Sequence, residues 1–110
     1  MYIKKLSEFI DIENERLKLY YNKDMDSEKL ILAKTVKLTE EVGELSEEVL
    51  KHCSLQRKEK MEKHNPDNLG EEFADVIIST MLLANSMNVD LEVALQNKIK
   101  KINDRYEKNK

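Results

Sequence analysis

Residues 68–87 read NLGEEFADVIISTMLLANSM, and this stretch decides the fold class. Its apolar side chains recur at positions that wrap most of the circumference of an α-helix. Asn68 followed by Glu71 resembles a capping box, so the helix is predicted to begin near Leu69. We therefore expect a central, buried helix with a narrow polar wedge. That wedge consists of Glu72, Asp75, Ser79 and Ser86.

Three further helices are predicted around this segment. Residues 3–20 carry apolar side chains at steps of three and four, interrupted by Glu13. Asp26 or Ser27 can cap a second helix that runs to about residue 52. Asp90 can cap a fourth helix. The apolar stripe of the second helix is predicted to be Ile31, Leu38, Val42, Leu45 and Val49, and that of the fourth Leu95, Ile99, Ile102 and Tyr106.

The four helices predict an all-α four-helix bundle that occupies residues 1–110 as a single domain. The chain contains only two glycines and one proline, whereas β-hairpins and nucleotide-binding α/β folds need many such turn residues. The third predicted helix is apolar on most sides. Its apolar surface is larger than three neighbouring helices in a 110-residue chain can cover. We therefore expect a homodimer or homotetramer, in which dimerisation completes the bundle.

Composition excludes several classes of partner. The formal net charge of −3 does not suggest a surface for polyanions, so we expect no nucleic-acid binding. The longest mainly apolar stretch, residues 76–84, is about half of the roughly 20 residues that span a membrane. Residues 1–10 lack the apolar region of a secretory signal. Cys53 has no partner for an internal disulfide, which fits a reducing, cytoplasmic location.

Acidic residues at matching spacings predict a cation site. Asp75 lies in an otherwise apolar helix, and an isolated buried carboxylate is costly unless it is paired, protonated or bound to a metal. Glu72 lies three residues earlier on the same face, and Glu41 and Glu44 repeat this spacing in the second helix. If the two helices pack antiparallel, four carboxylates face one another around a cation. Hard oxygen ligands favour Mg²⁺ or Mn²⁺ over Zn²⁺.

Other interpretations of these residues stay open or are excluded. The glutamates of the second helix, from Glu40 to Glu48, also suit an exposed helical face. A di-iron centre is excluded because such centres use Glu-x-x-His pairs, and neither His52 nor His64 stands three residues after a glutamate.

The two acidic blocks resemble the motif of the MazG-like, all-α nucleoside triphosphate pyrophosphohydrolases. They read Glu40-Glu41-Val42-Gly43-Glu44 and Glu72-Phe73-Ala74-Asp75, and both halves of the motif are complete. The resemblance implies that Mg²⁺ is bound by Glu41, Glu44, Glu72 and Asp75. It also makes Glu40 and Glu41 candidates for the catalytic base.

The fourth predicted helix carries a ridge of cations, Lys98, Lys101 and Arg105, spaced three and four residues apart. An exposed basic face is one interpretation of this ridge. Beside a metal site, however, such cations are suited to neutralising the charge of a leaving pyrophosphate. We therefore interpret these three residues as substrate-binding.

The sequence as a whole predicts a Mg²⁺-dependent nucleotide pyrophosphohydrolase. It would convert a nucleoside or deoxynucleoside triphosphate to the monophosphate and pyrophosphate, with cleansing of the nucleotide pool as a possible role. Two alternatives stay open. One is a noncatalytic helical interaction protein with a structural cation, and the other is a related enzyme of the phosphoribosyl-ATP pyrophosphohydrolase type.

Overall fold

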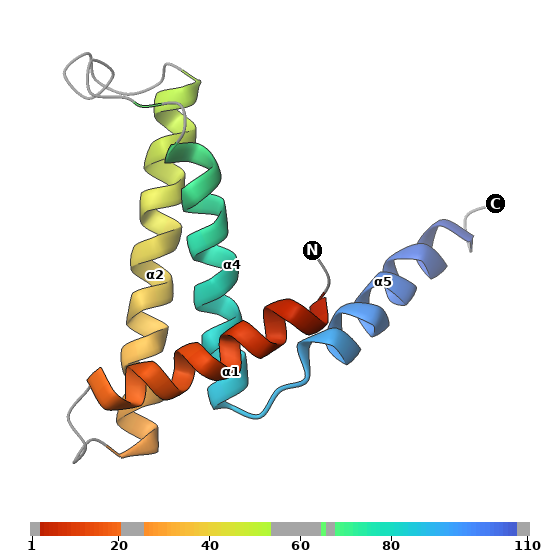
Figure 1. Cartoon of the computed structure of the whole chain (residues 1–110). Helices are drawn as coiled ribbons and strands as arrows, with labels where there is room; N and C mark the ends of the chain where they lie inside the picture. Colours follow the sequence, from red (N-terminus) through yellow and green to blue (C-terminus); the bar gives the residue numbers. More distant parts are fainter. Residues whose placement is uncertain (1–2, 21–25, 54–64, 66–67, 108–110) are drawn as a thin grey trace.

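The computed structural model describes residues 3–20, 26–53, 65 and 68–107, and these residues form four helices (Figure 1). They are α1 (Ile3–Tyr20), α2 (Ser27–His52), α4 (Asn68–Ser86) and α5 (Leu91–Glu107). No strand occurs among the described residues. The predicted all-α class is thus confirmed, and so are the four predicted helices.

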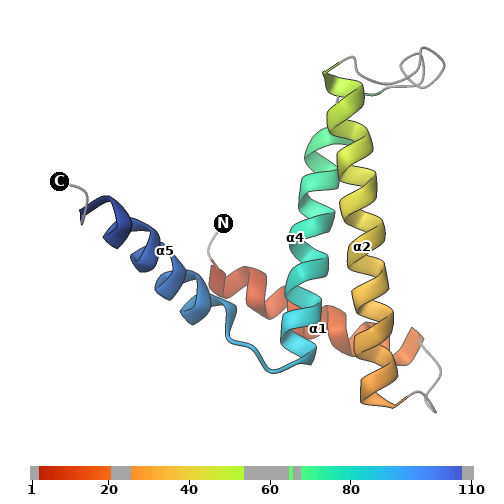
Figure 2. The ribbon, with the colours of Figure 1, turned by 180° about the vertical axis from the view of Figure 1, so that it is seen from behind.

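The long helices α2 and α4 lie side by side and antiparallel, and they make the most extensive contact between any two elements (Figures 1 and 2). Helix α1 crosses their lower end and packs mainly on α4. The one buried apolar side chain among the described residues, Ile10 of α1, is only 2% exposed. The paired helices α2 and α4 thereby provide the frame on which the acidic blocks face each other.

Side chains at the predicted positions cap two helices. The N-cap of α2 is Asp26, whose Oδ1 accepts a hydrogen bond from the backbone N–H of Lys29 at 2.8 Å. Asp90 precedes α5, and its Oδ1 accepts from the backbone N–H of Val93 at 3.2 Å. Both caps satisfy amides that have no partner within the helix, and both confirm the helix starts predicted from the sequence.

The turn between α4 and α5 sends the last helix away from the other three. Asn88 has a φ of 57°, in the left-handed region that often ends a helix. The backbone N–H of Val89 donates to the carbonyl of Ala84 at 2.9 Å, which closes the turn. Helices α4 and α5 meet at a bend of 112°. Helix α5 therefore makes little contact with the other helices of its own chain (Figures 1 and 2).

Burial differs from the prediction in both long helices. Helix α4 contains no buried residue, and Phe73 and Ile77 are 49% and 53% exposed. In α2, Val42 and Val49 are exposed although they belong to the predicted apolar stripe. The reason is the arrangement of the elements: α2 covers one side of α4, α1 covers one end, and α5 stands apart. The expected central helix is thus partly uncovered within a single chain.

None of the four helices, taken singly, is both long and apolar enough to cross a membrane. The bent pair α4 and α5 together passes the same test of length and composition.

Candidate active site

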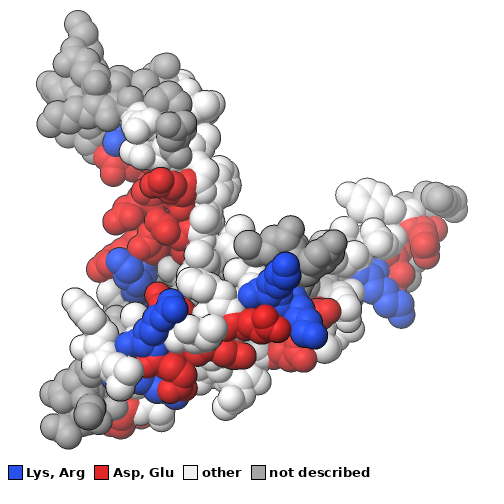
Figure 3. Space-filling model, viewed as in Figure 1, with Lys and Arg blue, Asp and Glu red and all other residues white. Residues whose placement is uncertain are grey.

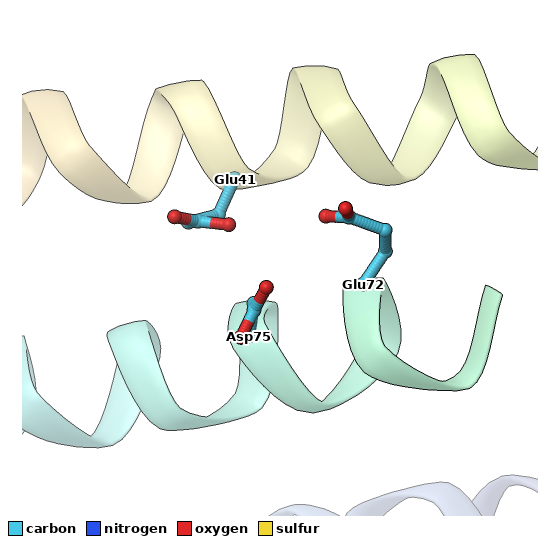
Figure 4. A group of neighbouring side chains, drawn as sticks. All are labelled: Glu41, Glu72 and Asp75. Carbon is cyan, nitrogen blue, oxygen red and sulfur yellow. The ribbon is translucent and has the colours of Figure 1, made fainter. Parts of the chain in front are cut away.

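Three of the four predicted metal ligands converge between α2 and α4. Glu41 points from α2 toward Glu72 and Asp75, which lie one turn apart on α4 (Figure 4). Each of these residues offers one carboxylate oxygen, and the three oxygens lie within 4.8 Å of one another. We call Glu41, Glu72 and Asp75 the carboxylate cluster. It forms because a spacing of three residues keeps Glu72 and Asp75 on the face of α4 that is turned toward α2.

Burial in the cluster is graded from α2 outward. Glu41 is 6% exposed, Glu72 is half-buried, and Asp75 is exposed. The expectation that Asp75 is the buried carboxylate is therefore wrong within one chain, because its side chain stays open to solvent although it faces α2. Glu41 of α2 is the buried carboxylate of the cluster instead.

Two oxygens of the cluster are buried without a hydrogen-bond partner among the described residues. They are Oε2 of Glu41 and Oε2 of Glu72. The other oxygen of Glu41, Oε1, lies 3.1 Å from the ammonium of Lys37. A buried carboxylate oxygen without a partner carries the full cost of lost hydration. A bound cation would satisfy both orphan oxygens.

Electrostatic repulsion in the cluster acts most clearly on Glu72. Desolvation raises the pKa of the Glu72 carboxyl, and the negative charges of Glu44 and Asp75 raise it further. Glu44 itself is exposed and does not belong to the group within 4.8 Å. It is nevertheless the strongest charge acting on Glu72, so it lies beside the cluster.

Glu40 lies outside the cluster on the exposed side of α2. Its Oε2 is 3.8 Å from the ammonium of Lys37. Lys37 therefore bridges Glu40 and Glu41 on the solvent side of α2, and the carboxylate of Glu41 raises the pKa of Lys37. Acidic side chains gather over α2 in Figure 3, whereas basic and acidic side chains are intermixed over α1 and α5.

The donor set of the cluster fits a hard divalent cation. The ligand atoms are all carboxylate oxygens, the group that Mg²⁺ and Mn²⁺ prefer. Two of the oxygens are buried and orphaned, and like charges this close are tolerable only around a cation. The residues present are therefore suited to hold such an ion.

The predicted substrate-binding cations lie far from the cluster within one chain. Lys98, Lys101 and Arg105 are exposed on α5, which diverges from α2 and α4 (Figure 1). The cations that line a cavity beside the cluster belong to α2 instead. They are Lys34 and Lys37. The role of the α5 cations stays a prediction. It requires α5 to lie beside a carboxylate cluster, either of its own chain or of a second copy.

A second polar group, which the sequence reasoning missed, lies where α1, α2 and α4 meet. The ammonium of Lys34 donates to Oδ1 of Asn14 at 2.8 Å and to Oγ of Ser86. Asn14 donates in turn to Asn85, and Asn85 donates to Asp11 at 2.9 Å. We call this network the lysine junction. Lys34 and Asn14 are 7% and 4% exposed, so the junction is a buried polar layer.

Residues 31–109 match the family model for the MazG nucleotide pyrophosphohydrolase domain. This match spans well over half of the chain and includes both acidic blocks, so the protein belongs to the MazG nucleotide pyrophosphohydrolase domain family. The comparisons with curated proteins and with solved structures gave no match.

Proposed function

We propose that this protein hydrolyses a nucleoside or deoxynucleoside triphosphate between the α and β phosphates, releasing the monophosphate and pyrophosphate. One observation carries the proposal. The carboxylate cluster, with its two orphan buried oxygens, lies on the two helices that hold the acidic blocks of a MazG domain.

In this proposal Glu41, Glu44, Glu72 and Asp75 hold Mg²⁺, for which Mn²⁺ can substitute. The bound cation supplies charge to the phosphate oxygens and promotes ionisation of the attacking water. The water oxygen forms a bond to the α-phosphorus, the bond from that phosphorus to the bridging oxygen breaks, and pyrophosphate leaves. Glu40 or Glu41 accepts the water proton.

Lys37 is suited to a supporting role at the same place. Its ammonium lies beside Glu41 in the absence of a ligand, and its side chain is 56% exposed. A cation at this position can turn from the carboxylate toward a phosphate oxygen with little change in burial.

We also propose that the active form is a homodimer or a dimer of dimers. Helix α5 leaves Val93, Leu95 and Ile99 about half exposed, with little of its own chain against them. A groove of about 700 Å³ opens between α1, α4 and the start of α5, with apolar side chains along it. In a closed two-fold arrangement each chain can cover the apolar surface of the other, so a second copy is the occupant that fits both surfaces.

Such an assembly gives the cations of α5 a possible route to the active site of the partner subunit. Mixing two inactive variants, Asp75→Asn and Lys101→Met, tests this arrangement. If each site combines the cluster of one chain with α5 of another, half of the mixed dimers are heterodimers with one intact site each. Activity then returns to about a quarter of the wild-type level. Mass spectrometry verifies that the subunits have exchanged. If activity does not recover after exchange, the cluster and the α5 cations of one site belong to the same chain.

For the cellular setting we propose a cytoplasmic enzyme that cleanses the nucleotide pool, without nucleic-acid or membrane partners. The exposed, unpaired Cys53 supports a reducing compartment. The net charge of −3 is consistent with a small-molecule substrate rather than a polyanion.

The decisive experiment measures pyrophosphate release from a panel of common and modified nucleoside triphosphates and from phosphoribosyl-ATP. We expect release with Mg²⁺ or Mn²⁺ and none with EDTA. Turnover of phosphoribosyl-ATP alone would favour the related enzyme class. Cation binding without turnover of any member would favour a noncatalytic interaction protein.

A further inference from the structure

A cavity of about 230 Å³ extends from the carboxylate cluster toward the lysine junction, between α1, α2 and α4. Glu41, Asp75 and Lys37 line its end at the cluster, and Lys34 lines it nearer the junction. Its walls carry apolar side chains from two helices. These are Leu17 of α1 and Ile78 and Leu82 of α4.

The two lysines that line this cavity, Lys34 and Lys37, lie at different distances from the cluster and therefore suit different parts of a ligand. Lys34 precedes Glu41 by seven residues, which is about 10 Å along α2 at 1.5 Å per residue. Its ammonium meets Ser86, which follows Asp75 by 11 residues, or about 16 Å along α4. A triphosphate chain held at the cluster does not reach this far. A whole nucleotide does, with its phosphates at the cluster and its base near Lys34.

The chemistry of the two ends agrees with this orientation. Lys37 is a solvent-exposed cation beside Glu41, as a phosphate requires. Leu17, Ile78 and Leu82 offer apolar contact for the faces of a base. Glu13 also lines the cavity, and its charge is balanced by Arg16 at 3.6 Å.

Lys34 has a hydrogen-bond donor to spare. An ammonium has three N–H groups and no acceptor, and two of them are used by Asn14 and Ser86. No carboxylate among the described residues forms a salt bridge with Lys34. Burial lowers the pKa of this lysine, and the charge of Lys18 lowers it further. A buried cation with only neutral partners needs one more acceptor.

We infer that the cavity holds the nucleoside part of the substrate and that Lys34 donates a hydrogen bond to a keto oxygen of the base. This inference rests on the proposed function and narrows its substrate class to nucleotides with a keto group at the base edge. An amino group at that position is itself a hydrogen-bond donor and cannot accept from the ammonium of Lys34, so both groups would be left unpaired.

The test compares substrates that differ in this group. Inosine and adenosine triphosphates differ at purine C6, and uridine and cytidine triphosphates differ at pyrimidine C4. We expect the wild-type protein to favour the keto member of each pair at least tenfold in kcat/KM. In Lys34→Met the ratio should fall to within about twofold of one, mainly through loss on the keto substrate.

A matched control separates recognition from a structural role. Ser86→Ala removes one partner of Lys34 but keeps the ammonium, so the keto preference should persist. An unchanged ratio in Lys34→Met, or a wild-type protein that does not favour keto bases, would overturn the inference.

The same comparison can be made without hydrolysis. Calorimetric titration of inosine and adenosine monophosphates with wild type and Lys34→Met gives the ratio of binding constants directly. A preference for inosine monophosphate that depends on Lys34, without pyrophosphate release from any nucleotide, would refute the proposed reaction and leave the base contact standing. Hydrolysis of nucleotides, together with a ratio of binding constants that does not change in Lys34→Met, would support the proposed reaction and refute the base contact.

Discussion

The carboxylate cluster lies between α2 and α4 and the lysine junction lies where α1 meets these two helices, yet the hydrogen bonding of the two groups differs. At the junction, hydrogen bonds join Lys34 to Asn14 and Ser86 and Asn14 to Asn85, and one N–H of Lys34 remains for a further acceptor. In the cluster, carboxylates face one another, and buried oxygens of Glu41 and Glu72 have no partner among the described residues. Hydrogen bonds from Lys34 to neutral partners hold the junction together before a ligand binds, whereas the facing carboxylates repel one another until a cation or a proton joins them.

The largest expected effect is on activity, through the cluster. Glu41→Gln, Glu44→Gln and Asp75→Asn each replace the carboxylate of a proposed metal ligand by a neutral amide and should each leave less than about a tenth of wild-type turnover at saturating Mg²⁺. Circular dichroism should show unchanged helix content. Glu47→Gln, on the same helix outside the acidic blocks, is the matched control and should keep its activity. Turnover above that level in all three variants would remove the ligand assignment.

The second effect is stabilisation by a cation. If Mg²⁺ binds only the assembled cluster, it should raise the free energy of unfolding by about 2.7 kcal/mol at a hundredfold excess over Kd. Na⁺ at matched ionic strength should do much less, because screening alone does not satisfy the orphan oxygens. Thermal unfolding in each salt measures the difference. Equal shifts with Mg²⁺ and Na⁺, unchanged by Asp75→Asn, would show an exposed acidic face instead of a site.

A third effect compares the two polar groups directly by mutation. Asn14→Leu keeps a similar volume but removes the acceptor of Lys34 and the donor to Asn85, so it should destabilise the protein by about 1–3 kcal/mol. Glu72→Gln removes one of several repelling charges, so without metal it should leave stability equal or slightly higher. Chemical denaturation measures both. Destabilisation of the same size in Asn14→Leu and Glu72→Gln would mean that the junction and the cluster contribute equally to the stability of the ligand-free protein, contrary to this comparison.

The smallest expected effect is on the pH dependence of stability. The pKa of Glu72 is raised in the folded protein, so the folded state holds a proton that the unfolded state has already lost. The stability of the metal-free protein should therefore decrease as pH rises from 4.5, the ordinary value, through the raised folded value. Glu72→Gln should flatten this decline, and Mg²⁺ should suppress it. Denaturation midpoints at a series of pH values provide the measurement.

The sequence predicts the helices and the cluster well because both depend on local spacing. The capping residues Asp26 and Asp90 fix helix starts through contacts within one turn, and Glu72 and Asp75 share a face whatever surrounds them. The burial of Asp75 was predicted wrongly because it depends on which helix covers α4. That covering is set by the direction of α5 after Asn88, which no periodicity encodes.

The lysine junction shows a signal that the sequence contained. Lys34, Glu41 and Glu48 are the buried residues of α2, and they stand seven residues apart. Because seven residues make about two helical turns, these three polar residues lie on one face of α2, the face toward α4. This face is next to the predicted apolar stripe and not opposite it. Asn14 likewise lies four residues after the buried Ile10. Polar residues in register with an apolar stripe are therefore candidates for buried networks, although their partners depend on how the helices cross.

The separation of α5 from its own chain also bears on how the protein folds. A helix of 17 residues is only marginally stable in water on its own, and most helical stability comes from packing. With its apolar side exposed and its N-terminus capped by Asp90, α5 is prepared to form but lacks a surface of its own chain to hold it. If the proposed dimer provides that surface, folding of α5 becomes a bimolecular event. Helix content should increase with protein concentration, and backbone amides of α5 should exchange with solvent faster in dilute protein than those of α2.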